Sequence, residues 1–109
     1  MADLKEVIFK LKQFRDARDW EQFHNSKDLA LAISIEASEL LELFLWKANE
    51  DIDIKKLKKE LADIFSFALL LADKHDLNVE QIILDKIEEN SKKYPVNKAK
   101  GTAKKYTDL

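Results

Sequence analysis

The sequence predicts an all-α protein, and two of its features carry that prediction. The chain has 109 residues but only one glycine and one proline, so it offers few of the tight turns that a β-sheet needs. Apolar residues recur at helical spacing through four long segments with short connections. Short connections make consecutive helices antiparallel. We therefore expect one domain, residues 1–109, built as an antiparallel four-helix bundle-like subunit.

The first two helices are assigned from their apolar patterns and capping residues. Residues 4–18 carry one apolar stripe, made of Leu4, Val7, Ile8, Leu11 and Phe14. A connector follows, and Ser26 is the expected N-cap of a second helix that ends near Lys47. This second helix is apolar around most of its circumference, through Leu29, Leu31, Ile33, Leu40, Leu41, Phe44 and Leu45. Such a helix is either central in the fold or shared with another subunit, so we expect a homo-oligomer.

The third and fourth helices have similar signals. Asp53 precedes a third helix at roughly 54–75, and Asn78 is placed to cap a fourth at about 79–93. The only proline follows this helix and stops it. The remaining residues, about 94–109, are rich in lysine and contain the only glycine, so we expect an irregular basic tail.

Composition excludes several classes of protein. With 46% hydrophobic and 37% charged residues, the chain resembles an ordinary globular protein. It has no cysteine, which rules out a disulfide framework or a thiolate metal site. The charged N-terminus lacks the pattern of a signal peptide, and the longest apolar run, residues 64–72, contains Ser66 and is too short to span a bilayer. We expect a cytoplasmic protein that does not bind membranes.

Charge is distributed unevenly along the chain. From Lys92 onward there are six lysines and one acid, a net charge of +5, so the rest of the chain carries −7 of the overall −2. The basic tail is either a solvated end or a segment that closes over a polyphosphate. The acidic remainder and the lack of a nucleic-acid motif argue against nucleic-acid binding.

Two pairs of acidic residues predict a metal site. Glu36 and Glu39 are three residues apart on the second helix, and Glu60 and Asp63 repeat this spacing on the third, so each pair shares a helix face. If the helices pack together, four carboxylates meet among apolar neighbours, and a hard cation such as Mg²⁺ or Mn²⁺ offsets their repulsion. The alternative is that Glu60 and Asp63 form solvated pairs with the lysines four residues before them.

A family resemblance extends this hypothesis. Residues 35–42 (IEASELLE) and 59–64 (KELADI) resemble the E-x-x-E…E-x-x-D signature of MazG-like nucleoside triphosphate pyrophosphohydrolases. Further blocks are similar to the dCTP pyrophosphatase branch of that family, in the same order along the chain: 18–24 (RDWEQFH), 44–47 (FLWK), 90–95 (NSKKYP) and 105–109 (KYTDL).

The resemblance implies a fold, a reaction and a site. Family members are all-α dimers or tetramers with active sites near subunit interfaces, and they cleave a nucleoside triphosphate to a monophosphate and pyrophosphate. By resemblance, catalysis and Mg²⁺ binding, with Mn²⁺ as a substitute, fall to Glu36, Glu39, Glu60 and Asp63. Glu39 is the expected proton acceptor. The nucleotide pocket is expected to include Trp20, His24, Trp46 and Phe67.

The expected substrate is dCTP or a modified dCTP, with removal of such nucleotides from the cellular pool as the role. The alternatives are the same chemistry on dUTP or another noncanonical nucleotide, or a non-catalytic helical interaction module. Some positions depart from the family pattern. Ile35 stands where many MazG-like proteins have a second glutamate, Phe67 where the dCTP branch has a tyrosine, and Leu11 where relatives have a histidine. Without the tyrosine hydroxyl, position 67 has no side-chain hydrogen bond to offer the substrate.

Overall fold

The computed structural model describes residues 1–109 and confirms the all-α fold class. It contains five α-helices and two short 3₁₀ helices, and it has no β-strand. The chain divides into two compact units, Met1–Asp76 and Leu77–Leu109. None of the helices combines the length and the apolar composition that a membrane span requires.

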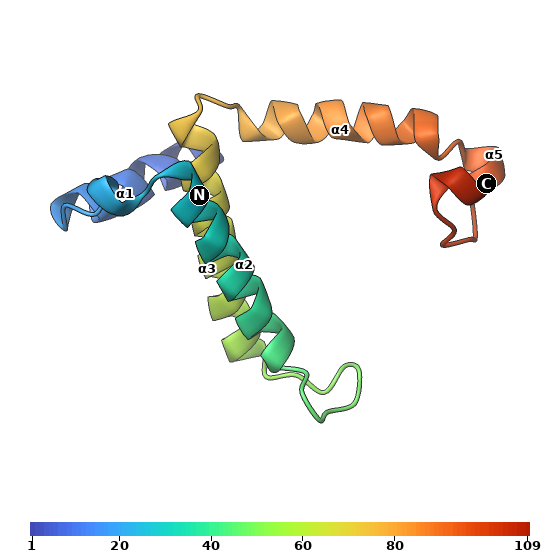
Figure 1. Ribbon diagram of the computed structural model, residues 1–109, viewed down its shortest axis with the longest axis horizontal. Coiled ribbons are helices and arrows are strands. Elements are labelled where there is room, and N and C mark those ends of the chain that lie inside the picture. The colour runs from blue at the N-terminus through green and yellow to red at the C-terminus, as the bar shows by residue number, and fades with distance from the viewer. The chain divides into compact units, whose positions relative to one another are not determined.

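The first unit consists of three α-helices and one 3₁₀ turn. These are α1 (Leu4–Ala17), η1 (Glu21–Phe23), α2 (Ser26–Glu42) and α3 (Ile54–Lys74). Helices α2 and α3 lie side by side and antiparallel, and α1 packs near the end where α2 begins and α3 finishes (Figure 1). Two side-chain contacts fasten this end. Ser26 Oγ lies 2.8 Å from His75 Nε2, and Lys12 Nζ lies 3.1 Å from a carboxylate oxygen of Asp73.

Asparagine and aspartate cap the N-termini of the four long helices, each accepting a hydrogen bond from a backbone N–H of the first turn. Asp53 caps α3 and Asn78 caps α4 (Val79–Lys93), which confirms both predictions. The prediction for α2 was wrong by one residue. Asn25 is the cap, and its side-chain oxygen accepts from the N–H of Asp28 at 2.8 Å. Ser26 is instead the first helical residue, and its hydroxyl bonds the His75 ring.

Helix α2 is also shorter than predicted, since it ends at Glu42 and not near Lys47. After Glu42 the backbone hydrogen bonds change from the α-helical to the 3₁₀ pattern. The N–H groups of Phe44 and Leu45 bond to carbonyls three residues back at 3.1 Å, and the N–H of Lys47 does the same. Trp46 then takes a left-handed conformation with φ of 60°, which the helix cannot continue through. The connection from α2 to α3 is therefore longer than the sequence indicated.

Only a small core is sealed within the chain. Leu29 of α2 is 2% exposed and packs with Leu70 and Ala72 of α3 as the buried apolar set. Much of the other side of α2 stays open, with Leu31 50% and Ile35 58% exposed. One face of α2 therefore packs on α3, and the rest of its apolar surface has no cover from this chain.

The second unit contains α4, α5 (Val96–Ala99) and η2 (Tyr106–Asp108). The segment expected to be an irregular tail thus includes one helical turn, started by Pro95, whose carbonyl accepts from Ala99 N–H at 2.9 Å. Tyr106 lies edge-on to Tyr94 with ring centroids 5.9 Å apart, and Lys93 Nζ lies 5.0 Å from the Tyr106 ring. Helix α4 has no buried residue. The four-helix bundle arrangement remains a prediction.

Candidate functional site

Three of the four acidic residues singled out in the sequence come together where α2 and α3 run side by side. Glu36 projects from α2, and Glu60 and Asp63 project from α3. One carboxylate oxygen of each lies within 4.8 Å of the others. The arrangement follows from the three-residue spacing, which places both α3 acids on the face toward α2. Glu39 is exposed and lies outside this set of three, but its carboxyl is close enough to act on the pKa of Glu36.

Two carboxyl groups of this cluster, those of Glu36 and Glu60, resist ionisation. The pKa of Glu36 is raised from 4.5 to about 7, first by desolvation and then by the neighbouring carboxyl of Glu39, which both hydrogen-bonds and repels it. Asp63 adds further repulsion. The pKa of Glu60 is also raised, with desolvation again the largest cause. Negative charge is thus held at close quarters without a cationic side chain to neutralise it.

Two of these carboxylates also have an oxygen with no partner. Glu36 Oε2 and Glu60 Oε2 are buried and accept no hydrogen bond. A buried polar atom without a partner costs about 1–3 kcal/mol, and more when it is charged. A divalent cation with oxygen ligands at about 2.1 Å would satisfy both atoms and bring ligand oxygens to separations of about 3 to 4 Å. The residues present therefore fit a Mg²⁺ or Mn²⁺ ion.

An apolar cavity of about 230 Å³ adjoins the carboxylates and shares Asp63 with them. Its apolar walls are Leu11, Phe14, Trp20, Phe67 and Leu70, and its polar lining is Arg15, His24, Asp63 and Ser66. Three residues that the resemblance assigned to a nucleotide pocket, Trp20, His24 and Phe67, thus line one cavity. Apolar walls with a few polar groups are typical of a small-molecule site.

The aromatic rings of this cavity are arranged edge to face. Phe14 and Trp20 have centroids 5.7 Å apart, and His24 and Phe67 have centroids 6.5 Å apart, both with planes at 76°. Trp20 is 43% exposed, which leaves part of its indole free. His24 Nδ1 is buried and has no hydrogen-bond partner. The cavity therefore offers a flat apolar ring, and one of its lining residues, His24, carries a buried nitrogen without a partner.

Trp46 lies elsewhere. Its side chain is 94% exposed on the connection that follows α2, and it does not line the cavity. The Trp46 side chain contacts very little of this chain, so it is not a core residue. Its backbone is left-handed, which is unusual for a residue with a large side chain.

A second, more polar cavity of about 250 Å³ shares Arg15, His24 and Leu70 with the first. The rest of its lining is Lys12, Glu21, Leu29, Asp73 and Lys74. Lys12 and Arg15 were not predicted as site residues from the sequence. The available signal was their register, since Arg15 follows Leu11 by four residues and therefore lies along the apolar stripe of α1. A charged residue in that position is partly buried and needs partners.

The lysines expected to approach a polyphosphate all lie in the second unit. Lys93 forms an ion pair with Glu89 at 3.2 Å and contacts Tyr106. The pKa of Glu89 is lowered by hydrogen bonds with Lys93 and Lys86. Lys92, Lys104 and Lys105 are exposed. Their contact with a phosphate remains a prediction.

Comparison with known proteins places this geometry in a family. A family model described as MazG-like matches residues 31–109. The chain is 39% identical over 105 residues to dCTP pyrophosphatase 1 of Bos taurus and 33% identical to that of Homo sapiens, covering 89% of this chain in each case. It spans 62% of the length of these curated relatives.

A solved structure agrees with this likeness. The crystal structure of a pyrophosphatase from Archaeoglobus fulgidus superposes with a TM-score of 0.78 at 34% identity, over 87% of this chain and 94% of that one. The three clustered carboxylates, Glu36, Glu60 and Asp63, all fall inside the range that the family model matches. By sequence and by fold, the chain belongs to the MazG-like family.

Proposed function

We propose that this chain is a divalent-metal-dependent nucleoside triphosphate pyrophosphohydrolase acting on dCTP or a modified dCTP. The observation that carries the proposal is the contact between two features, a carboxylate cluster with unsatisfied buried oxygens and an aromatic-walled cavity, which share Asp63. A metal-binding group beside a base-sized apolar cavity matches the two ends of a nucleotide. The names of the relatives point to the same reaction and to dCTP.

In this proposal Glu36, Glu39, Glu60 and Asp63 hold Mg²⁺, with Mn²⁺ as a substitute. The ion would neutralise charge on the triphosphate and lower the pKa of a bound water. Glu39 is exposed beside the three close carboxylates, and in this proposal it also accepts the proton of the attacking water. The water oxygen bonds to the α-phosphorus and the bond to the bridging oxygen breaks, releasing a monophosphate and pyrophosphate.

The cavity supplies recognition of the base. The partly exposed indole of Trp20 offers a stacking face, which contributes about 1–3 kcal/mol per base. His24 Nδ1 is free to hydrogen-bond the base edge. Phe67 offers only an apolar edge there, so in this proposal other polar groups of the lining, such as His24 and Ser66, make the hydrogen bonds that select the base.

The same proposal includes a homo-oligomer, a dimer or a tetramer. Large apolar side chains on α2 and α4 are more than 40% exposed: Leu31, Ile35, Leu41, Ile82, Ile83, Leu84 and Ile87. Burying a fully exposed side chain of this kind contributes about 1.5–3 kcal/mol, so covering one that is about half exposed contributes about half of that. Light scattering coupled to size exclusion would test this, and a monomeric mass across the micromolar range would contradict it. A role in clearing nucleotides from the cytoplasmic pool is part of the proposal.

The direct test is product analysis. The purified chain is incubated with Mg²⁺ and a panel of triphosphates that includes dCTP, 5-methyl-dCTP and dUTP, and products are separated by ion exchange. We expect monophosphate and pyrophosphate from a cytosine nucleotide. Asp63→Asn and Glu39→Gln should abolish the products, whereas Glu42→Gln, an exposed acid at the end of the same helix, should not.

Two other outcomes would each change a different part of the proposal. Turnover of dUTP alone would keep the chemistry and replace the base assignment. Survival of every triphosphate with both Mg²⁺ and Mn²⁺ would overturn the proposal and favour a non-catalytic interaction module.

A further inference from the structure

The segment between α1 and α2 carries two of the rings that line the cavity, those of Trp20 and His24. Few hydrogen bonds join this segment to the rest of the chain. Its backbone bonds are local. The N–H of Trp20 donates to the Arg15 carbonyl at 3.1 Å, and the N–H of His24 donates to the Glu21 carbonyl at 3.0 Å. Gln22 Nε2 bonds back to Asp19 within the segment. Together with the edge-to-face contact of Phe14 and Trp20, these bonds hold the start of the segment to α1, but none of them joins α1 to η1.

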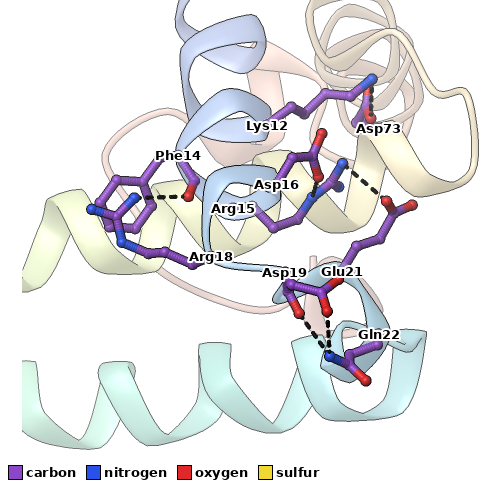
Figure 2. Close-up of polar contacts among 9 residues, drawn as sticks. All are labelled: Lys12, Phe14, Arg15, Asp16, Arg18, Asp19, Glu21, Gln22 and Asp73. Carbon is purple, nitrogen blue, oxygen red and sulfur yellow. Dashed lines mark hydrogen bonds and ion pairs between the residues drawn. The ribbon is translucent and has the colours of Figure 1, made fainter.

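The Arg15 side chain makes that connection. Its guanidinium bonds Asp16 with Nε at 2.8 Å and reaches Glu21 of η1 from Nη2 at 3.6 Å (Figure 2). Arg15 is thereby joined to the first residue of the turn that separates Trp20 from His24. The Arg15 side chain is 11% exposed, so it is fixed by its surroundings in a way that a surface arginine is not.

Position reinforces this connection. Arg15 lies between the two cavities and lines both, together with His24 and Leu70. One turn of helix earlier, Lys12 is paired with Asp73 of α3 at 3.1 Å, which fixes this face of α1 to α3 (Figure 2). Lys12 thus fixes α1 to α3, and Arg15 joins the same helix to the segment that carries the aromatic rings.

We infer that Arg15 is a positioning residue, whose ion pair with Glu21 holds Trp20 and His24 in the orientation that forms the base-binding cavity. The inference rests on the proposed function for its kinetic consequence but not for its structural one. It predicts a loss in nucleotide binding with little loss in the chemical step, because Glu36, Glu60 and Asp63 lie on α2 and α3 and keep their positions.

Two variants and one control test this. Arg15→Met keeps the aliphatic length and removes the charge, and Arg15→Lys restores a cation. Lys10→Met removes a matched α1 cation whose pair with Glu6, at 3.6 Å, is exposed and lines neither cavity. For Arg15→Met we expect KM for dCTP to rise about three- to fivefold with kcat within about twofold of wild type. Arg15→Lys should recover at least half of that loss on a logarithmic scale, and Lys10→Met should match wild type.

A structural readout separates positioning from direct contact with substrate. The full-length chain is labelled with 5-fluorotryptophan, which gives two ¹⁹F resonances because it has only Trp20 and Trp46. Without any nucleotide, Arg15→Met should shift or broaden the Trp20 resonance and leave that of exposed Trp46 unchanged. Glu21→Gln should act in the same direction, and this variant decides the matter if Arg15→Met does not fold.

The results of these experiments distinguish a failure of the inference from a failure of the proposed function. An unchanged Trp20 resonance in both variants, or a fall in kcat with unchanged KM, would overturn the inference. A wild-type chain that hydrolyses no triphosphate would overturn the proposed function instead, and the ¹⁹F spectra would still decide the role of Arg15.

Discussion

Replacing Glu36 with glutamine should stabilise the metal-free protein at alkaline pH while removing its response to Mg²⁺. The pKa of Glu36 is about 7 in the folded chain, against 4.5 for an ordinary glutamate. Between these values the folded state holds more protons than the unfolded state, so folding stability falls as pH rises through this window. Glutamine resembles the protonated carboxyl and removes this loss.

The size of the effect follows from the pKa difference. At about 1.4 kcal/mol per pKa unit, a rise from 4.5 to about 7 corresponds to roughly 3 kcal/mol. Glu36 is only partly withdrawn from solvent, and screening by water reduces the effect, so we expect about 1–2 kcal/mol at pH 8. For a domain of this size that raises Tm by about 5 to 10 °C.

The assay is thermal unfolding followed by circular dichroism at pH 4.5 and pH 8, each with EDTA or with Mg²⁺. Glu36→Gln should exceed wild type at pH 8 in EDTA, match it at pH 4.5, and gain nothing from Mg²⁺, whereas wild type should gain. Glu42→Gln on the same helix is the matched control and should follow wild type throughout. A variant that is less stable than wild type at pH 8 in EDTA, or that Mg²⁺ still stabilises fully, would refute the reasoning.

Three further substitutions have expected outcomes. Trp20→Ala should raise KM for the nucleotide by about 5- to 100-fold through lost stacking, measured by steady-state kinetics, and an unchanged KM would remove Trp20 from the pocket. Asn25→Ala should lower the free energy of unfolding by about 1 kcal/mol in urea, because the N–H of Asp28 loses its cap. Leu29→Ala should cost about 2–5 kcal/mol in the same assay, while Leu31→Ala, at a half-exposed position, should cost far less; equal losses would contradict the assignment of the core.

Local signals predicted the helices well, and competition between neighbouring residues explains the errors. The bounds of α4 were predicted correctly because Asn78 and Pro95 flank it without rivals. At the start of α2 both Asn25 and Ser26 are good caps, and the choice depends on His75, which lies 49 residues away and takes the Ser26 hydroxyl. Sequence alone does not reveal that partner.

In the candidate site, too, some positions follow from local spacing and others depend on contacts between elements. The spacing of Glu60 and Asp63 requires a shared helix face, so their meeting with Glu36 needed only that α2 and α3 pack together. The place of Trp46 depended instead on a backbone conformation, with φ of 60°, that no periodic pattern encodes. The burial of Arg15 depended on Glu21 and on the packing of α1, which are contacts between elements.

Asp63 belongs both to the carboxylate cluster and to the lining of the aromatic cavity. Whatever occupies one of these places sets the charge and the side-chain position that the other encounters. If a cation tightens the binding of a base, the base must tighten the binding of the cation by the same factor, since coupling between two equilibria is reciprocal. In the cell, the effective affinity of this protein for its nucleotide would then follow the concentration of free divalent ions, and a fall in those ions would release both ligands together.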